Sequence, residues 1–443
     1  MSSPSLPSSV RIGYGLGSVA TGAFGTVPGL MLLPFLTDTL GIAAGVAGLI
    51  VFLPKAWDVI LNPIAGRISD RTADPRGPRR PFLLKAGLAL AVCFALLFAG
   101  PDLGSRLLDG LWVLVLFVAC ATAYAFFQVP YVAMPAEITS SYDERTRLMT
   151  WRVAILAFAI MASGALSPMI RNQFEGRTGY RLMGLFVAAM LVIGVLGAYF
   201  GTRSAPIGRP RADAASLRDQ LRIVAAARDF RLLLTTFVIQ AVATGAMLAG
   251  VDYVARNVLR SDGAATILFV CFVGPALLLT GAFSVLGRRI GKKAGYVVAS
   301  LIFATGAALL VTAGSAAPWV VYAATALVGC GYAGAQVFPL AMLPDAAAVD
   351  ARRTGHNRAG LYTGVWTAAE TLGMAVGPAL FALVLTMGGY LSSTTGAVVQ
   401  SDQAVRAIVL GFSLIPAALV ALSLVFLRGY SLDATEVEGE VAT

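Results

Sequence analysis

The sequence predicts an all-α membrane protein with twelve transmembrane helices. Of its 443 residues, 58% are hydrophobic and only 13% are charged, whereas a soluble domain carries about 25% charged residues. The apolar residues gather in twelve runs, each long enough to cross a bilayer as a helix. Membrane-spanning strands would instead give short alternating segments, so the runs favour helices.

One long connection divides the predicted spans into six and six. The segment 203–230 holds a Pro/Gly-rich piece followed by a pattern typical of an amphipathic surface helix. We therefore expect an N-terminal six-helix bundle over 1–202, a cytoplasmic linker over 203–230, a C-terminal six-helix bundle over 231–428 and a disordered cytoplasmic tail over 429–443. Two six-helix halves are typical of one large class of secondary transporters. The predicted spans are 12–38, 44–68, 82–101, 110–134, 150–171, 181–202, 231–256, 264–287, 294–313, 318–343, 360–387 and 404–428.

Charge and composition set the orientation and exclude several classes of protein. Lys and Arg concentrate in alternate loops, which puts both termini in the cytoplasm of a bacterial-type inner membrane. The net charge of +10 could suggest nucleic acid, but the small charged fraction argues against it. One histidine, His356, and no Walker-type loop argue against a metal site, a catalytic triad or direct use of ATP, so we expect no enzyme and no cofactor. The cysteines at 93, 120, 271 and 330 lie in apolar runs, which predicts free, buried thiols. We expect a monomer whose partners are a small-molecule solute and the bilayer.

The span 44–68 carries the polar residues on which the functional interpretation depends. Lys55, Asp58 and Asn62 fall within about 60° of one another around a helix, so they share one face. A charge at the centre of a bilayer costs roughly 2.5–3.5 kcal/mol on insertion scales, so this face cannot point at lipid. Lys55 and Asp58 could simply neutralise each other as an internal ion pair. Alternatively, Asp58 binds a cation or a proton during transport.

Polar residues in two further spans allow a functional and a structural interpretation. In the span 110–134, Tyr124, Gln128 and Tyr131 lie at i, i+4 and i+7, beside Pro130, which frees a backbone carbonyl. They predict either a substrate path or a polar packing network. Arg152 begins the span 150–171 and either snorkels to the cytoplasmic surface or donates hydrogen bonds to a substrate.

The second half of the chain also carries intramembrane polar residues. In the span 360–387, Trp366 and Glu370 lie four residues apart, with Thr371 beside them. This cluster lines a cavity, or Trp366 is an ordinary packing residue. Asp252 and Arg256 are predicted to form an i, i+4 ion pair near a helix end. Glycines in the first span predict close helix contact or flexibility: Gly13, Gly15, Gly17, Gly22 and Gly25.

Five motifs in order make the chain resemble the glycoside–pentoside–hexuronide:cation symporters, the melibiose-carrier branch of the major facilitator superfamily. The resemblance covers about residues 11–428 and implies two pseudo-symmetric six-helix halves. It also implies a cation site on the second and fourth spans, a sugar site between the halves, and cytoplasmic gate residues at Asp70, Arg71, Arg79 and Arg80. The motifs are LTDTLG (36–41), WDVILNP (57–63), GRISDRT with PRGPRRPFL (66–84), QVPYVAMPAEIT (128–139) and RTGHNRAGLYTGVWTAAETLG (353–373).

The chain departs from the family pattern at the cation site. The family usually carries WDxxxDP, but the second carboxylate is Asn62 here. An adjacent polar position is Leu61, and the hydroxyl expected on the fourth span is Ala125. Sodium needs a shell of oxygen ligands, so a lone carboxylate at Asp58 fits a proton better.

The sugar site departs from the family as well. The family's sugar-binding acid of the first span falls at Gly22, and an acid of the fourth span falls at Gln128. Arg152 matches the family's sugar-contacting arginine, and the lysine position of the eleventh span falls at Thr371, next to Glu370.

The leading hypothesis is proton-coupled symport of a sugar, glycoside or similar small polar solute by alternating access, with sodium as the less favoured ion. Asp58 would carry the proton, with Asn62 and Lys55 as its partners. An uncoupled facilitator or an exporter of a more apolar, lipid-like compound is the alternative, and a membrane sensor that binds solute without moving it is a third. The residues expected to bind substrate are Tyr124, Gln128, Arg152, Trp366, Glu370 and Thr371.

Overall fold

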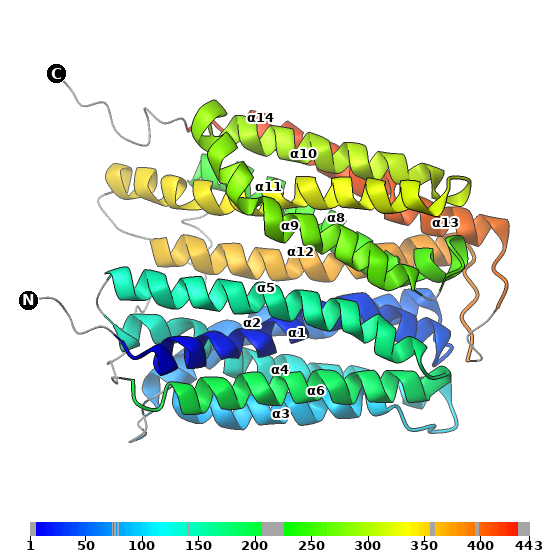
Figure 1. Ribbon diagram of the computed structural model, residues 1–443, viewed down its shortest axis with the longest axis horizontal. Coiled ribbons are helices and arrows are strands. Elements are labelled where there is room, and N and C mark those ends of the chain that lie inside the picture. Colours follow the sequence, from blue (N-terminus) through cyan, green and yellow to red (C-terminus); the bar gives the residue numbers. More distant parts are fainter. Residues whose placement is uncertain are drawn as a thin grey trace, which may run out of the picture. The chain divides into compact units, whose positions relative to one another are not determined.

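The computed structural model describes residues 6–72, 74, 77, 79–139, 142–205, 226–261, 263–354, 359–394 and 398–432. Within these residues all regular structure is helical (Figure 1). Twelve helices among them are long and apolar enough to cross a membrane. The predicted all-α fold with twelve spans is therefore confirmed. Residues 206–225 of the linker, the tail beyond residue 432 and His356 lie outside the described residues.

The chain divides into two compact units, and the first comprises residues 1–213 together with 391–399. The short segment 391–399 joins this unit because the backbone N–H of Ser393 donates to the carbonyl of Thr37. The helices of the first unit are α1 (Ser8–Asp38), α2 (Ala44–Arg71), α3 (Arg80–Ala99), α4 (Arg106–Ile138), α5 (Tyr142–Asn172) and α6 (Gly176–Gly201).

The second unit comprises residues 214–390 and 400–443. Its last span is broken at Ser413, so α13 and α14 together form one crossing. A π-helical turn ends the first crossing, where buried Asp252 pairs with Arg256 at 3.1 Å, as predicted. The elements are α8 (Arg228–Tyr253), η1 (Val254–Val258), α9 (Ala264–Ile290), α10 (Lys292–Leu309), η2 (Leu310–Gly314), α11 (Pro318–Thr354), α12 (Ala359–Met387), α13 (Asp402–Phe412) and α14 (Leu414–Arg428).

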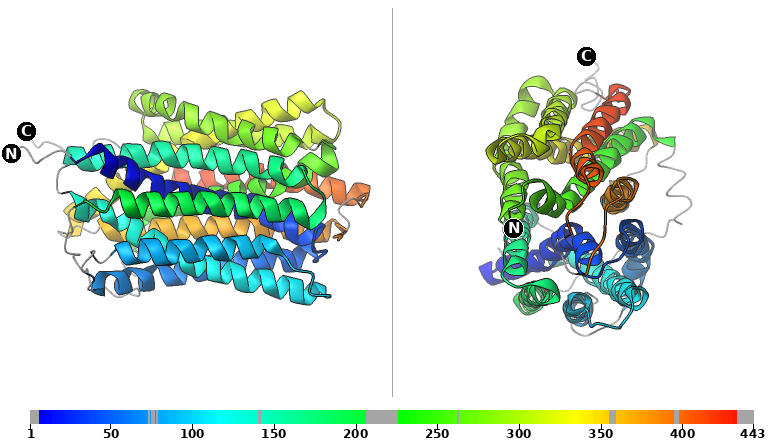
Figure 2. Two further views of the ribbon diagram at one scale, coloured as in Figure 1. Left: turned by 60° about the horizontal axis from the view of Figure 1, so that its bottom comes forward. Right: turned by 90° about the vertical axis from the view of Figure 1, so that its right-hand side faces the viewer.

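Each unit repeats the same helix packing. In the first unit α1 packs against α5 and α6, α3 packs against α4 and α6, and α2 packs against α4. In the second unit α8 packs against α12 and α14, α10 packs against α11 and α14, and α9 packs against α11. The end-on view of Figure 2 shows the helices of each unit in cross-section as a bundle. Helices α1 to α6 thus correspond in order to α8, α9, α10, α11, α12 and the pair α13–α14.

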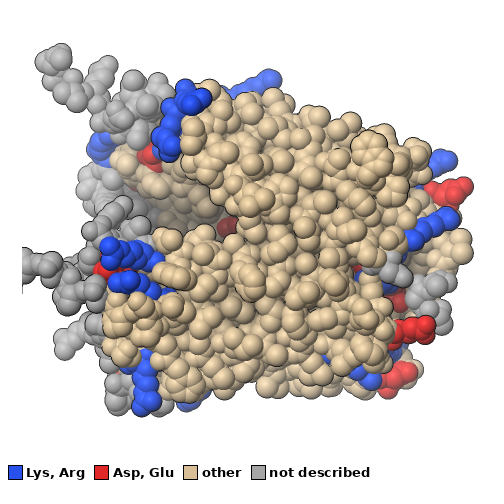
Figure 3. Space-filling model, in the orientation of Figure 1, with Lys and Arg blue, Asp and Glu red and all other residues tan. Residues whose placement is uncertain are grey.

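The surface has the pattern that a membrane demands. On the face shown in Figure 3, Lys, Arg, Asp and Glu gather at the helix ends, and the long flanks are mostly uncharged. Helix α2 illustrates the cause, because one of its faces exposes large apolar side chains while Asp58 is only 4% exposed. The polar face of α2 is therefore turned into the first unit, away from lipid. The exposed apolar residues of α2 include Val46, Leu49, Leu53, Trp57 and Ile60.

The cysteines are free, as predicted, but only one of them is fully buried. All four are free, and Cys120 is buried while the other three are partly buried. Since none pairs with another, the bundles are held together by apolar packing and hydrogen bonds.

Candidate functional site

Lys55 and Asp58 lie in the first unit as close neighbours without a direct ion pair. The ammonium group of Lys55 lies 4.8 Å from the ring centroid of Phe24 on α1 and 6.0 Å from that of Phe117 on α4. One carboxylate oxygen of Asp58, Oδ1, is buried and accepts no hydrogen bond from the described residues. The lysine is thus stabilised by cation–π contacts, which leaves the carboxylate available to another partner.

Near this carboxylate, apolar side chains fill the contact between α2 and α4. Leu61 and Ala125 are buried together with Ala65 in one apolar cluster. The Oδ1 atom of Asn62 is buried and has no hydrogen-bond partner among the described residues. The two positions at which the family resemblance implies oxygen ligands therefore present only carbon atoms here.

A second group of polar residues joins α1, α4 and α5. The Tyr131 hydroxyl donates to the carbonyl of Tyr14 at 2.7 Å and lies 2.9 Å from the hydroxyl of Ser18. The Tyr131 ring stacks on that of Tyr14 with centroids 4.8 Å apart. The guanidinium carbon of Arg152 lies 5.7 Å from the centroid of the Tyr131 ring, and within the part of the chain that the structure describes its buried Nε has no hydrogen-bond partner. Arg152 thus lies against Tyr131 inside the unit and keeps one donor free for a ligand.

Tyr124 and Gln128 place further polar groups along the same helix as Tyr131. The ring of Tyr124 lies 4.5 Å from that of Phe24, the residue beneath Lys55. The Oε1 atom of Gln128 is buried and accepts no hydrogen bond from the described residues. The structure therefore links Tyr124 to the Lys55 region through Phe24, while Gln128 keeps an unused acceptor.

Gly22, where the resemblance expects an acid, lies close to α5. A Cβ atom at Gly22 would lie 3.1 Å from the Cβ of Ala159 and 3.3 Å from the Leu156 side chain on α5. Any side chain at this position would therefore require the neighbouring residues of α5 to shift.

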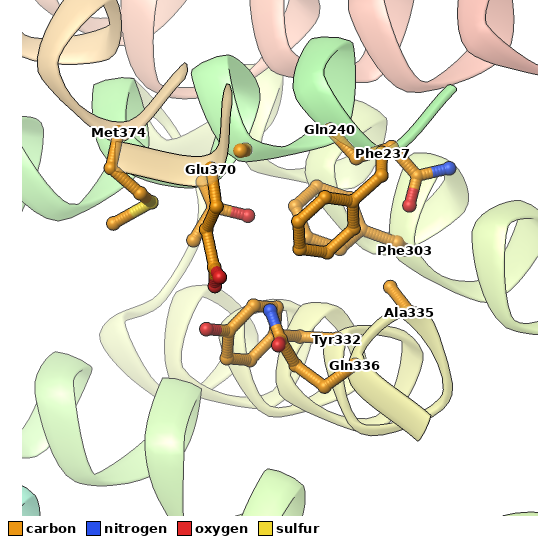
Figure 4. Close-up of a pocket in the computed structure, with 10 residues that line it drawn as sticks. Phe237, Gln240, Phe303, Tyr332, Ala335, Gln336, Glu370 and Met374 are labelled. Carbon is orange, nitrogen blue, oxygen red and sulfur yellow. The ribbon is translucent and has the colours of Figure 1, made fainter. Parts of the chain in front are cut away.

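The second unit contains a pocket that Glu370 enters from α12 (Figure 4). Its volume is about 80 Å³, enough for several water-sized groups. Glu370 points toward Tyr332 and Gln336 on α11 (Figure 4). The residues that line the pocket are Phe237, Gln240, Ala241, Thr244, Phe303, Tyr332, Ala335, Gln336, Glu370 and Met374.

Trp366 and Thr371, the neighbours of Glu370, do not line this pocket. Trp366 is 1% exposed, and its ring stacks on that of Phe237 with centroids 4.4 Å apart. The Thr371 hydroxyl donates to the carbonyl of Thr367 one turn back. Within the second unit Trp366 therefore packs in the aromatic core, and substrate-binding roles for it and Thr371 stay predictions.

The predicted gate residues include a buried network at one end of the first unit. Arg79 donates to Asp70 at 2.6 Å, to Glu137 at 2.8 Å and to Ser69 at 2.6 Å, and so joins α2, α3 and α4. Arg71, in contrast, is exposed.

Arg80 makes further contacts at the same end of the first unit. It donates to the carbonyls of Thr202 and Ala205, both at 2.7 Å, just beyond the end of α6. These contacts stabilise the unit internally, and a role in gating stays a prediction.

Several residues of these sites were not anticipated. Tyr14 and Ser18 on α1, and Gln240 and Thr244 on α8, are polar pairs four residues apart inside apolar spans. Tyr332 and Gln336 on α11 repeat the pattern. The rule that singled out Asp58 and Asn62, polar residues sharing one face of an apolar helix, would have found all three pairs. Phe24 carries no such signal, because a phenylalanine in an apolar span is ordinary.

Comparison with known proteins decides the family. A model of the MFS/sugar transport protein family matches residues 13–434. The chain belongs to this family, within the glycoside–pentoside–hexuronide:cation symporter branch of the major facilitator superfamily. It is accordingly a multi-pass membrane transporter of a small-molecule solute and not an enzyme.

Two relatives and one solved structure match nearly the whole chain. A glucuronide carrier protein homolog of Escherichia coli (strain K12) is 24% identical over 433 residues, which cover 95% of this chain and 92% of that protein. The isoprimeverose transporter of Lactiplantibacillus pentosus is 24% identical over 446 residues, covering 97% and 90%. The crystal structure of a D-xylose–proton symporter matches the fold with a TM-score of 0.71 at 14% identity, covering 97% of this chain and 98% of that one.

Proposed function

We propose that this protein is a proton-coupled symporter of a sugar, glycoside or similar small polar solute, with Asp58 as the group that carries the proton. The observation that carries the proposal is the buried Asp58 carboxylate, whose Oδ1 has no hydrogen-bond partner although Lys55 lies one turn away. A carboxylate that already formed a strong ion pair or hydrogen bond would gain little stabilisation from binding a proton. A buried carboxylate without such a partner gains the most stabilisation.

A proton suits this site better than sodium. Sodium would need several oxygen ligands around Asp58. The packing of Leu61 against Ala125 supplies carbon instead, and Asn62 offers one amide oxygen. A proton needs a single acceptor, which the carboxylate provides.

Lys55 would make the conformation of the bundle depend on whether Asp58 is protonated. Its ammonium is held by the rings of Phe24 and Phe117, so it does not leave when Asp58 takes up a proton. Neutralising Asp58 then leaves the buried lysine charge without its compensating neighbour. The protonated and charged forms thus favour different conformations, which coupling requires.

The solute would be recognised by the free polar groups of α4 and α5. Gln128 contributes an unused acceptor and Arg152 an unused donor. A guanidinium offers a fixed planar set of donors that suits the adjacent hydroxyl oxygens of a sugar ring. The related isoprimeverose transporter and glucuronide carrier homolog carry names of sugar-derived solutes, which supports this class. We also propose that both termini are cytoplasmic, from the distribution of Lys and Arg.

Transport in proteoliposomes tests the proposal. We expect an imposed inward proton gradient to drive solute accumulation, and a protonophore to abolish it. Asp58→Asn should lose accumulation yet retain solute exchange at zero gradient, because an amide can hold no transferable proton. Asp102→Asn is the matched control, since Asp102 lies in the loop between α3 and α4 with its side chain 79% exposed, and it should accumulate solute like the parent.

Two results would overturn the assignment. Full pH-driven accumulation by Asp58→Asn would exclude Asp58 as the coupling group. Because Asp58 is only 4% exposed, the mechanism also requires the bundle to open. If Asn62→Cys never reacts with a small thiol reagent from either side, with or without solute, the proton has no path to this site.

A further inference from the structure

We propose that the second unit holds a binding site for one monovalent metal cation, formed around Glu370 in the pocket of Figure 4. This site would be separate from the proton site proposed at Asp58. The argument depends on the orientation of one amide, on the charge of one carboxylate and on the repeated packing of the two units.

The amide of Gln240 is oriented by its neighbours. The Ser423 hydroxyl donates its only hydrogen to the carbonyl of Val420 at 2.6 Å. Its oxygen can therefore only accept at the Gln240 contact, which makes the atom 2.9 Å away the amide nitrogen, Nε2. The same nitrogen donates to Ser300 at 2.9 Å. Both hydrogens of the amide are thus used, and no described group donates to its oxygen, Oε1.

Gln240 is only 4% exposed, and so is its neighbour Thr244 one turn along α8. Both line the pocket, and the structure gives the Thr244 hydroxyl no hydrogen bond within the described residues. A carbonyl and a hydroxyl that line a cavity without protein partners are stabilised by an occupant of that cavity that binds them. The cavity of about 80 Å³ beside them is large enough to hold such an occupant.

Glu370 supplies one negative charge to the same cavity. Among the described residues no Lys, Arg or hydrogen-bond donor pairs with its carboxylate. The ion pairs among the described residues of the second unit, Arg256 with Asp252 and Lys292 with Asp345, do not involve it. The titratable group that faces it is the Tyr332 phenol on α11, which is neutral at physiological pH. An ionised Glu370 would therefore lack a counter-charge inside the membrane.

The chemistry of these groups selects the occupant. One carboxylate with neutral carbonyl and hydroxyl oxygens balances one positive charge, whereas Ca²⁺ sites in proteins gather several acidic ligands. Hard oxygen ligands suit an alkali cation and not a soft metal. A proton would neutralise Glu370, but it would satisfy one further acceptor at most and would leave the cavity unfilled. A small cation such as Na⁺ would pair with the Glu370 carboxylate and use neutral oxygens that line the same pocket.

The repeated packing places this pocket where the first unit has its polar cluster. Helices α8, α11 and α12 correspond to α1, α4 and α5, which carry Tyr14, Tyr131 and Arg152. Arg152 and Glu370 each lie about three turns from the start of their helices. The first unit thus holds a cation at the place where the second holds an anion, so only the second can receive a metal cation there.

Binding of radiolabelled ²²Na⁺ to the purified full-length protein tests the proposal without any need for transport. We expect saturable binding in choline chloride at a fixed neutral pH, displaced by unlabelled Na⁺. Glu370→Gln should weaken the affinity by about tenfold or more. Thr244→Val, which removes one oxygen at equal volume, should weaken it less, while Thr244→Ser should bind like the parent. Asp102→Asn, at a side chain that is 79% exposed in the first unit, should bind like the parent.

The contrary results are distinct. Absence of saturable alkali-cation binding, or unchanged binding in Glu370→Gln, would overturn the site. Loss of binding in Asp58→Asn but not in Glu370→Gln would place the cation in the first unit. If Glu370→Gln does not stay monodisperse, the Thr244→Val and Thr244→Ser pair decides, and equal affinities in the two would also overturn the site. Failure of proton-driven uptake leaves these binding results unaffected.

Discussion

The ammonium group of Lys55 lies over the ring of Phe24, 4.8 Å from its centroid, instead of forming an ion pair with Asp58. This contact argues against the simplest structural interpretation of α2, in which the two charges would form a direct ion pair. The aromatic ring provides part of the stabilisation of the lysine charge. The carboxylate consequently stays free for the proton that we propose it carries.

Asn62→Asp tests why sodium is disfavoured at this site. A second carboxylate one turn from Asp58 restores the charge pattern of the family and should raise the sodium dependence of uptake. The measurement is uptake in sodium against choline, repeated in a Glu370→Gln background to remove the proposed second-unit site. An unchanged response would show that the hydrocarbon of Leu61 and Ala125 decides the ion.

Arg79→Gln tests the network at the ends of α2, α3 and α4. The change removes one partner of ion pairs with Asp70 and Glu137 in which the arginine side chain is 8% exposed. Breaking such a buried pair costs about 3 kcal/mol or more, because the carboxylates stay behind without their partner. We expect a clearly lower thermal unfolding midpoint in detergent. Arg71→Gln, at an exposed position, should change it by less than about 0.5 kcal/mol equivalent, and equal effects would refute the role of the network.

Glu144 should make the attachment of the N-terminal segment sensitive to acid. Burial by itself would raise the pKa of Glu144, but the Leu6 N–H at 3.2 Å, Arg11 at 3.1 Å and Arg147 together hold that pKa below its usual value. A lowered folded-state pKa means that the contact stabilises above the unfolded value of about 4.3. That contribution is lost as the pH falls through the folded-state pKa.

Hydrogen exchange at Leu6 measures this effect, because its N–H is bonded to Glu144. Protection should fall when the pH drops below about 4, after correction for the intrinsic exchange rate. Glu144→Gln should remove the pH dependence and reduce protection at neutral pH. Glu175→Gln, at an exposed site, is the control. A Leu6 signal that does not change with pH in the parent protein would contradict the prediction.

Two glycines of α1 should respond oppositely to alanine. A Cβ at Gly13 would lie 2.4 Å from the Cα of Gly201 on α6, whereas a Cβ at Gly25 meets nothing within 4 Å. Gly13→Ala must push the two helices apart and should cost about 1–3 kcal/mol. Gly25→Ala should be neutral or stabilising by up to about 1 kcal/mol, since alanine favours the helix. Thermal unfolding of the two variants compares them directly, and equal midpoints would exclude the close-contact role of Gly13.

The prediction from sequence succeeded where the bilayer imposes simple rules. Each predicted span lies on one of the twelve candidate spans, because twenty or so consecutive apolar residues have one stable form in lipid. The ion pair of Asp252 with Arg256 was also predictable, since it depends only on i, i+4 spacing along one helix. Trp366 shows the limit of such reasoning. Its residue type suits a sugar, yet its ring stacks on Phe237, from a helix far away in the sequence.

The sequence by itself therefore determined the membrane class, the twelve helices, the family and the inward-facing charges of α2, because these follow from local composition and helical period. Only the tertiary structure decided which partners those charges have. Lys55 contacts the rings of Phe24 and Phe117 from two other helices, and hydrogen bonds to serines on α10 and α14 orient the amide of Gln240. Such contacts join residues far apart in the chain. Their distances depend on how helices pack against one another, which no local pattern records.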